Sequence, residues 1–235
     1  MTTTAQLDAI TNGLVNGDTA PSRPSHGVAL ESIRWETYEM LCEDLAECPA
    51  IRLTYDNGSL HIMTLLPEHE SYSILLGQFI RVLATECQLP FRSFGSTTYK
   101  SKDLKKGLEP DNCFYLASLP RILGKRKLDL TRDPAPDLAI EIDITSSSVS
   151  RMPIYAALRV PEVWRFDGVV LQAHQLGENG EYQPTANSLA FPFLQLADVV
   201  PFLLQVFDKD EGSLTEAFRS WLKTEILPRW RKSTS

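Results

Sequence analysis

A run of alternating residues from Asp137 to Thr145 has the clearest potential for chemistry in this sequence. Alternation of apolar and polar residues is typical of a β-strand with two different faces. One face carries three carboxylates, from Asp137, Glu141 and Asp143. Carboxylates gathered on one face repel one another, and a bound divalent cation is the usual compensation. The strand therefore predicts a metal site.

The spacing along this strand indicates which carboxylates can share an ion. Glu141 and Asp143 lie two residues apart, which places their Cα atoms about 6–7 Å apart and lets both reach one metal. Asp137 lies about 13 Å from Glu141 and is a poor candidate for the same ion. A neighbouring strand, expected at 108–116, can bring the carboxylate of Asp111 against Glu141. The candidate set is Asp111, Glu141 and Asp143, with Glu70 or His69 from a long helix.

Oxygen ligands of this kind suit Mg²⁺ or Mn²⁺, which can activate water and stabilise the transition state of phosphoryl transfer. A plainer interpretation of the same residues is a solvated strand face and a turn that begins with Pro110-Asp111. Carboxylates with shifted pKa values also occur in purely structural networks. The residues by themselves leave both interpretations open.

Two further segments could contact phosphate. A serine-rich turn at 145–148 precedes Arg151, and its hydroxyls could donate to phosphate, although such turns more often cap helices. A run of cations could follow a nucleic-acid backbone, although such runs are more often solvated loops. These cations are Lys100, Lys102, Lys105, Lys106, Arg121, Lys125, Arg126 and Lys127.

Composition limits the class of protein. The 235 residues are 43% hydrophobic and 23% charged, which is typical of a globular chain with a core. We expect a flexible N-terminal segment at 1–27, a main domain at 28–228 and a C-terminal tail at 229–235. The net charge of −7 argues against tight, indiscriminate nucleic-acid binding, because counterion release needs a basic surface.

The sequence also predicts a location. Its longest apolar runs are too short to cross a bilayer, and no secretory signal opens it. The four cysteines have no metal-binding or CxxC spacing and lie in apolar surroundings, which favours reduced core residues. We therefore expect a cytoplasmic protein with no membrane partner.

The elements expected around the acidic strand alternate in type, which predicts an α/β or α+β fold with a mixed sheet flanked by helices and an additional N-terminal hairpin. Asn57-Gly58 marks that hairpin, because both residues tolerate positive φ. Gly107, after the basic run, is expected to form a turn. The expected order is a helix from Trp35, a hairpin at 51–63, a helix at 67–87, strands at 90–99 and 108–116, the acidic strand, a helix at 153–159, a hairpin at 163–176 and a helix from Ser213.

Five motifs, in this order, resemble those of a known family, and the resemblance covers about 30–225. The family is the restriction-endonuclease-like family that is abundant in cyanobacteria, was long classed as a domain of unknown function, and is related to the PD-(D/E)-x-K nucleases. The motifs are Pro67-Glu68-His69-Glu70, Phe94-Gly95-Ser96-Thr97-Thr98, Gly107-Leu108-Glu109-Pro110-Asp111, Pro136 through Ser146, and Tyr155 through Trp164.

This resemblance implies a restriction-endonuclease-like fold and a Mg²⁺-dependent endonuclease that hydrolyses DNA. It also implies a homodimer, since cutting both strands needs two sites. Asp111 and Glu141 match the two acidic ligands, Glu70 matches the acidic residue of the preceding helix, and Asp143 occupies the place of the usual lysine. The resemblance thus implies catalytic roles for Asp111, Glu141, Arg151 and Glu70, and metal ligation by Asp111, Glu141 and Asp143.

One departure from the family's pattern bears on activity. The family's lysine has moved to the start of the next helix, four residues before a tyrosine, and here that position is Arg151. Arginine can hold phosphate, but its pKa is too high for it to act as a base. Weakened cleavage follows, with two alternatives: a catalytically inactive nucleic-acid-binding or regulatory protein on the same fold, and a metal-dependent phosphoesterase with a small or RNA substrate.

Overall fold

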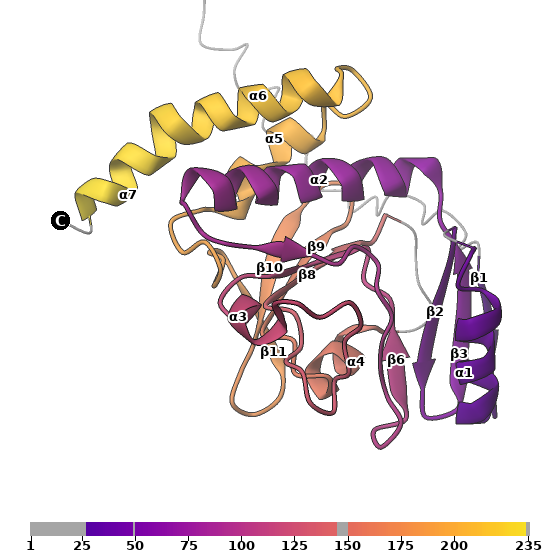
Figure 1. Ribbon diagram of the computed structural model, residues 1–235. Coiled ribbons are helices and arrows are strands. Elements are labelled where there is room, and N and C mark those ends of the chain that lie inside the picture. The colour runs from indigo at the N-terminus through magenta and orange to yellow at the C-terminus, as the bar shows by residue number, and fades with distance from the viewer. Residues whose placement is uncertain (1–26, 49, 145–149, 234–235) are drawn as a thin grey trace, which may run out of the picture.

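The acidic strand lies inside the larger of two β-sheets (Figure 1). The computed structural model describes residues 27–48, 50–144 and 150–233. All but the last residue of the expected N-terminal segment, and the serine-rich turn at 145–148, lie outside the described residues.

The larger sheet has six strands in the order β11-β10-β9-β8-β7-β4. Its central strand, β8, pairs antiparallel with β7 and parallel with β9. Parallel strands need a crossover between them, and helix α4 (Met152–Ala157) lies in that connection. The strands are β4 (Arg92–Ser93), β7 (Asn112–Tyr115), β8 (Leu138–Ile142), β9 (Glu162–Phe166), β10 (Leu171–Leu176) and β11 (Tyr182–Thr185).

Both faces of β8 are buried. Its apolar face, with Ile140 at its centre, packs in the main core against helix α2 (Pro67–Glu86). The other face packs through Ala139 on a second cluster that includes Ile154 of α4. The predicted alternation is therefore confirmed, but the polar face is covered rather than solvated.

The strand is also shorter than the alternation suggested. Asp137 precedes β8, and its carboxylate accepts hydrogen bonds from the backbone N–H groups of Leu116, at 2.6 Å, and Ser118, at 2.9 Å. These bonds fix the chain just before helix α3 (Leu119–Ile122). Asp137 is thus structural, in agreement with its distance from Glu141 along the strand.

The smaller sheet contains the predicted hairpin and has the order β1-β3-β2-β6-β5. Residue Gly107, predicted to form a turn, lies in a strand of this sheet, which corrects that expectation. A glycine is needed there because a Cβ atom would lie 2.2 Å from the hydroxyl of Tyr38. The elements are β1 (Gly27–Leu30), α1 (Trp35–Asp44), β2 (Ile51–Asp56), β3 (Ser59–Thr64), β5 (Tyr99–Ser101) and β6 (Lys106–Leu108).

C-terminal helices cover the outer side of α2, as Figure 1 shows. The last helical stretch begins at Glu211 rather than Ser213, because the carboxylate of Asp210 accepts a hydrogen bond from Ser213 N and caps the helix. Helical structure continues to Ser233, past residue 228 where the expected domain ends. The elements are α5 (Val200–Leu203), α6 (Glu211–Trp221), a π-helical turn (Leu222–Ile226) and α7 (Leu227–Ser233).

Two expectations from composition can be compared with these elements. In the parts of the chain that the structure describes, every helix is too short or too polar to cross a membrane. The prediction that all four cysteines are core residues is wrong for Cys48, which is exposed, whereas Cys113 is buried.

Candidate active site

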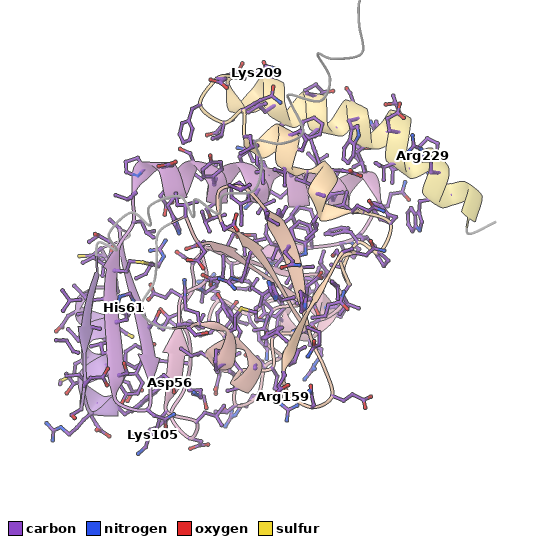
Figure 2. All side chains as sticks on the ribbon, turned by 180° about the vertical axis from the view of Figure 1, so that it is seen from behind. Asp56, His61, Lys105, Arg159, Lys209 and Arg229 are labelled. Atoms are coloured by element: carbon purple, nitrogen blue, oxygen red, sulfur yellow. The ribbon has the colours of Figure 1, made fainter. Side chains whose placement is uncertain are left out.

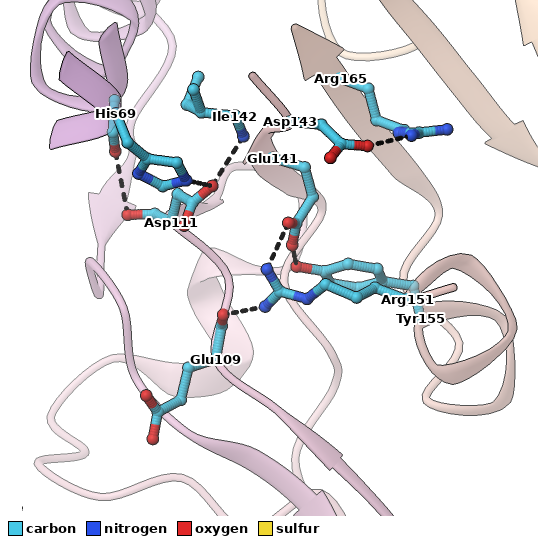
Figure 3. Close-up of polar contacts among 10 residues, drawn as sticks. His69, Glu109, Asp111, Glu141, Ile142, Asp143, Arg151, Tyr155 and Arg165 are labelled. Carbon is cyan, nitrogen blue, oxygen red and sulfur yellow. Dashed lines mark hydrogen bonds and ion pairs between the residues drawn. The ribbon is translucent and has the colours of Figure 1, made fainter. Parts of the chain in front are cut away.

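The site forms where the chain passes from the smaller sheet to the larger one, between the end of β6 at Leu108 and the start of β7 at Asn112. Asn112 pairs with Ile140, so the preceding residue, Asp111, lies opposite Glu141. Asp111 N donates to Ile140 O at 3.1 Å, and Ile142 N donates to Asp111 Oδ2 at 2.7 Å (Figure 3). The carboxylate is therefore fixed by the backbone of β8.

Asp111 is buried with one oxygen unused. Its side chain is only 1% exposed, and Oδ1 accepts no hydrogen bond from any residue that the structure describes. A buried carboxylate oxygen without a donor is unfavourable unless another group binds it. This oxygen is therefore available to a cation or to a hydrogen-bond donor.

His69, in the first turn of α2, lies beside the same carboxylate, with its Nε2 3.2 Å from Asp111 Oδ2. Burial by itself lowers the pKa of His69, but the close contact with the Asp111 carboxylate outweighs it and the pKa is raised. Burial likewise raises the pKa of Asp111, yet the close contact with His69 brings it below its usual value. Both shifts favour an imidazolium paired with a carboxylate.

Two side chains from the beginning of α4 hold Glu141. Arg151 Nη1 lies 2.5 Å from Glu141 Oε2, and the hydroxyl of Tyr155 donates to Glu141 Oε1. Residues four apart share one face of a helix, which explains how both reach one carboxylate. Arg151 Nη2 also donates to the backbone carbonyl of Glu109 (Figure 3). The guanidinium therefore joins the acidic strand to the crossing segment between the sheets.

The charge of Glu141 depends on Arg151. Burial has the largest effect on Glu141 and raises the pKa of its carboxyl group to about 8, while the Arg151 charge opposes this. The guanidinium itself keeps its charge, because its pKa is raised further by Glu141. A neutral residue at position 151 would therefore raise the pKa of the Glu141 carboxyl group further.

The structure does not bring two of the expected residues to this pair. Asp143 is bound by Arg165 of the neighbouring strand β9 and is 32% exposed, and Figure 3 shows it turned away from Asp111. Glu70 is 44% exposed and lies 3.7 Å from Arg52. Neighbouring helical residues point about 100° apart, so when His69 faces Asp111, Glu70 cannot.

Sequence reasoning missed two contributions to the site. Tyr155 was part of a motif but had no assigned role, although its spacing of four from Arg151 was a usable signal. The Glu109 carbonyl could not have been found, because every residue has a backbone carbonyl and only the fold selects one. His69 was expected only as the alternative to Glu70.

The described residues fit a divalent ion in part. They contain no cluster of three or more His, Cys, Asp or Glu side chains in metal-binding geometry. Asp111, just before β7, and Glu141, on the adjacent strand β8, nevertheless supply hard oxygen ligands, with Asp111 Oδ1 available, which fits Mg²⁺ that keeps several of its waters. Asp111, Glu141 and the Glu109 carbonyl are the groups that could hold such an ion.

Four of the eight cations predicted to follow a nucleic-acid backbone form ion pairs with other residues that the structure describes. Lys100 lies 3.6 Å from Glu39 and Lys102 lies 3.7 Å from Glu36. Lys106 contacts Asp56, and Figure 2 shows Asp56 and Lys105 together at one end of the smaller sheet. Lys125 contacts Asp133. Nearby acids therefore offset much of this positive charge.

A family model and a solved structure are similar to this chain. The model of the family Uma2, described as "putative restriction endonuclease", matches residues 35–208. No curated protein matches the sequence. The crystal structure of a "putative nuclease belonging to DUF820" from Anabaena variabilis is similar with a TM-score of 0.42 and 16% sequence identity, over 65% of this chain and 91% of that one.

Proposed function

The chain belongs to the Uma2 family, and on this premise we propose that it is a Mg²⁺- or Mn²⁺-dependent endonuclease that hydrolyses DNA phosphodiester bonds. The observation that carries the proposal is the pair of buried carboxylates Asp111, just before β7, and Glu141, on the adjacent strand β8, with Asp111 Oδ1 left unbonded within the described residues. A buried carboxylate oxygen without a donor is unfavourable, and a divalent ion can bind it.

Each side chain of the site has a role in this proposal. Asp111 and Glu141 hold the ion, which when bound supplies a Lewis acid that activates water and stabilises charge on the phosphate. His69 keeps Asp111 oriented, and Tyr155 keeps Glu141 oriented, from opposite sides of the pair. Arg151 binds the phosphate oxygen on which charge develops during water attack. Asp143 is left out of the ligand set, because Arg165 holds it.

The test is nicking of supercoiled plasmid with Mg²⁺ or Mn²⁺. We expect the wild-type protein to nick DNA, Glu141→Ala to lose the activity, and Asp143→Asn to keep it. Asp143→Asn is the matched control, because it removes one carboxylate charge two residues from Glu141 on the same chain segment. Nicking that survives Glu141→Ala would come from a contaminant and would refute the proposal. A single-stranded RNA substrate run in parallel tests the phosphoesterase alternative.

A second candidate function is a catalytically inactive nucleic-acid-binding or regulatory protein on the same fold. It is favoured by one observation: both oxygens of Glu141 already accept hydrogen bonds, from Arg151 and Tyr155. This candidate predicts DNA binding without cleavage, and no gain of cleavage when lysine is restored by Arg151→Lys. Fluorescence anisotropy of labelled DNA, beside the plasmid assay on the same preparations, separates the two candidates.

We also propose a homodimer, because cleavage of both DNA strands by one site type needs two copies. Light scattering of the purified protein measures its mass in solution. A monomer that nicks plasmid without linearising it would refute the homodimer and would leave the proposed endonuclease activity standing.

A further inference from the structure

We propose that Arg151 is the built-in counter-ion of the metal site, so that its contact with Glu141 and the binding of a divalent ion exclude each other. The inference rests on the proposed function, since it assumes that Asp111 and Glu141 are the ligands. It adds a feature that this function does not require: without metal, the guanidinium of Arg151 occupies the carboxylate oxygen of Glu141 that an ion would bind.

The position of the guanidinium supports this directly. Arg151 Nη1 lies 2.5 Å from Glu141 Oε2, and Nη2 donates to the carbonyl oxygen of Glu109. Both acceptors are oxygens of the kind that a hard cation binds. The guanidinium thus lies between two of the three groups that could hold an ion.

Burial makes the two cations incompatible. The side chains of Arg151 and Glu141 are 11% and 7% exposed, so little water lies near them to screen charge. Two positive groups that share one carboxylate oxygen in such surroundings repel each other strongly. A divalent ion at Glu141 Oε2 therefore requires Arg151 to leave, and a nearby phosphate is a suitable new partner for a guanidinium.

Tyr155 allows this exchange without moving Glu141. Its hydroxyl donates to Oε1, whereas Arg151 contacts Oε2, so the two residues of α4 hold different oxygens of the same carboxylate. When Arg151 leaves, Oε2 becomes available while Oε1 stays bound. Only the long, flexible arginine side chain needs to change conformation.

The experiment compares Arg151→Met with the wild-type protein by two measurements: Mn²⁺ affinity by calorimetry, and melting temperature with and without Mn²⁺. Methionine has a similar length and no charge. Both measurements are made above the pKa of Glu141 in the variant, because loss of the Arg151 charge raises that pKa and a protonated carboxyl group does not bind metal. We then expect Arg151→Met to melt at a lower temperature without metal, to bind Mn²⁺ on the order of tenfold more tightly, and to regain melting temperature when Mn²⁺ is added. The matched control is Arg165→Met, which removes an arginine from Asp143 and should change neither Mn²⁺ affinity nor its effect on melting.

Failure of the inference and failure of the proposed function give different results. If the wild-type protein binds Mn²⁺ and Arg151→Met binds it no more tightly, the counter-ion role is overturned and the metal site stands. If neither protein binds Mn²⁺, the ligand assignment fails, and the inference with it. Should Arg151→Met not fold, Arg151→Lys is used, because an ammonium contacts fewer oxygens than a guanidinium. It should bind Mn²⁺ more tightly than wild type, and equal or weaker binding would overturn the inference.

Discussion

Tyr155→Phe removes one hydroxyl from the site and nothing else, which makes its effect calculable. The side chain is buried, and phenylalanine fills the same space apart from the oxygen, so no large cavity forms. The change deletes the hydrogen bond to Glu141 Oε1 and leaves that oxygen buried. A hydrogen bond to a charged group contributes about 1.5–3 kcal/mol to stability. We therefore expect the free energy of unfolding to fall by about 2–3 kcal/mol.

Urea unfolding without metal measures this loss. Trp164 is fully buried in the larger sheet, so its fluorescence reports unfolding. With a denaturant slope of about 2 kcal/mol per molar urea, the midpoint should fall by about 1–1.5 M. Burial, followed by the charge of Glu141, raises the pKa of Tyr155 far above its usual range, so its hydroxyl stays protonated. The pKa of Glu141 is about 8, so the full loss should be seen above that pH, where the carboxylate is charged, and a smaller loss below it.

The partner is identified by repeating the change in a Glu141→Met background. If the hydroxyl acts through Glu141, Tyr155→Phe should then have almost no effect, which gives a coupling energy of about 2 kcal/mol. The matched control is Tyr182→Phe, whose hydroxyl donates to a neutral carbonyl, Val160 O, at 2.6 Å. It should lose only about 0.5–1.5 kcal/mol. An equal loss from Tyr155→Phe in both backgrounds would refute the role of Tyr155 in holding Glu141.

Three further changes test other parts of the structure. Asp111→Asn keeps an acceptor for Ile142 N, so unfolding free energy should change by no more than about 1–2 kcal/mol, whereas calorimetry should detect no Mn²⁺ binding; retained binding would contradict the ligand assignment. Glu162→Gln places an amide N–H₂ against the donors Trp164 Nε1, Leu189 N and Ala190 N, and should destabilise by about 1–3 kcal/mol in urea. The hydrogen bond from Ser213 N holds the pKa of the Asp210 carboxyl group below its usual value. The stabilisation of the helix by this cap is therefore present at neutral pH and is lost as the pH falls through the pKa of Asp210 in the folded protein. Asp210→Ala should therefore lower the melting temperature at about pH 6 more than at about pH 3, with Asp208→Ala as the control. An equal difference in melting temperature between wild type and Asp210→Ala at both pH values would contradict the capping role of Asp210.

The parts of the fold that could be predicted are those set by local patterns. The alternation around Ile140 identified the central strand, and Asn57-Gly58 identified the hairpin, because side-chain period and turn conformation are properties of a few adjacent residues. Gly107 was wrongly predicted to form a turn. A glycine is required at this position because the Tyr38 side chain, from another element, lies where a Cβ atom would be, and the local sequence does not show this contact. The same limit explains the division into two sheets, which depends on pairings between distant strands.

The site shows this limit at the level of single contacts. The pairing of Asp111 with Glu141 could be predicted, because Asp111 directly precedes one strand, Glu141 lies on its neighbour, and that neighbour relation could be inferred. The contact of Asp143 with Arg165 could not be predicted, because Arg165 lies on β9 and the sequence does not show the register of β9 against β8. The choice of His69 over Glu70 is decided by the rotation of α2 about its axis, and a helix with apolar residues on several sides does not reveal that rotation in its sequence.

The charges of the site explain why two carboxylates can be buried together in a chain of net charge −7. Each acid has its own cation: His69 for Asp111 and Arg151 for Glu141. Removing either cation leaves a buried charge without compensation, which is strongly unfavourable. The metal-free protein is therefore stabilised by the arrangement that competes with an incoming ion. A phosphate that attracts Arg151 lowers this competition, since it gives the guanidinium another negative partner, so ion and substrate should each favour the binding of the other.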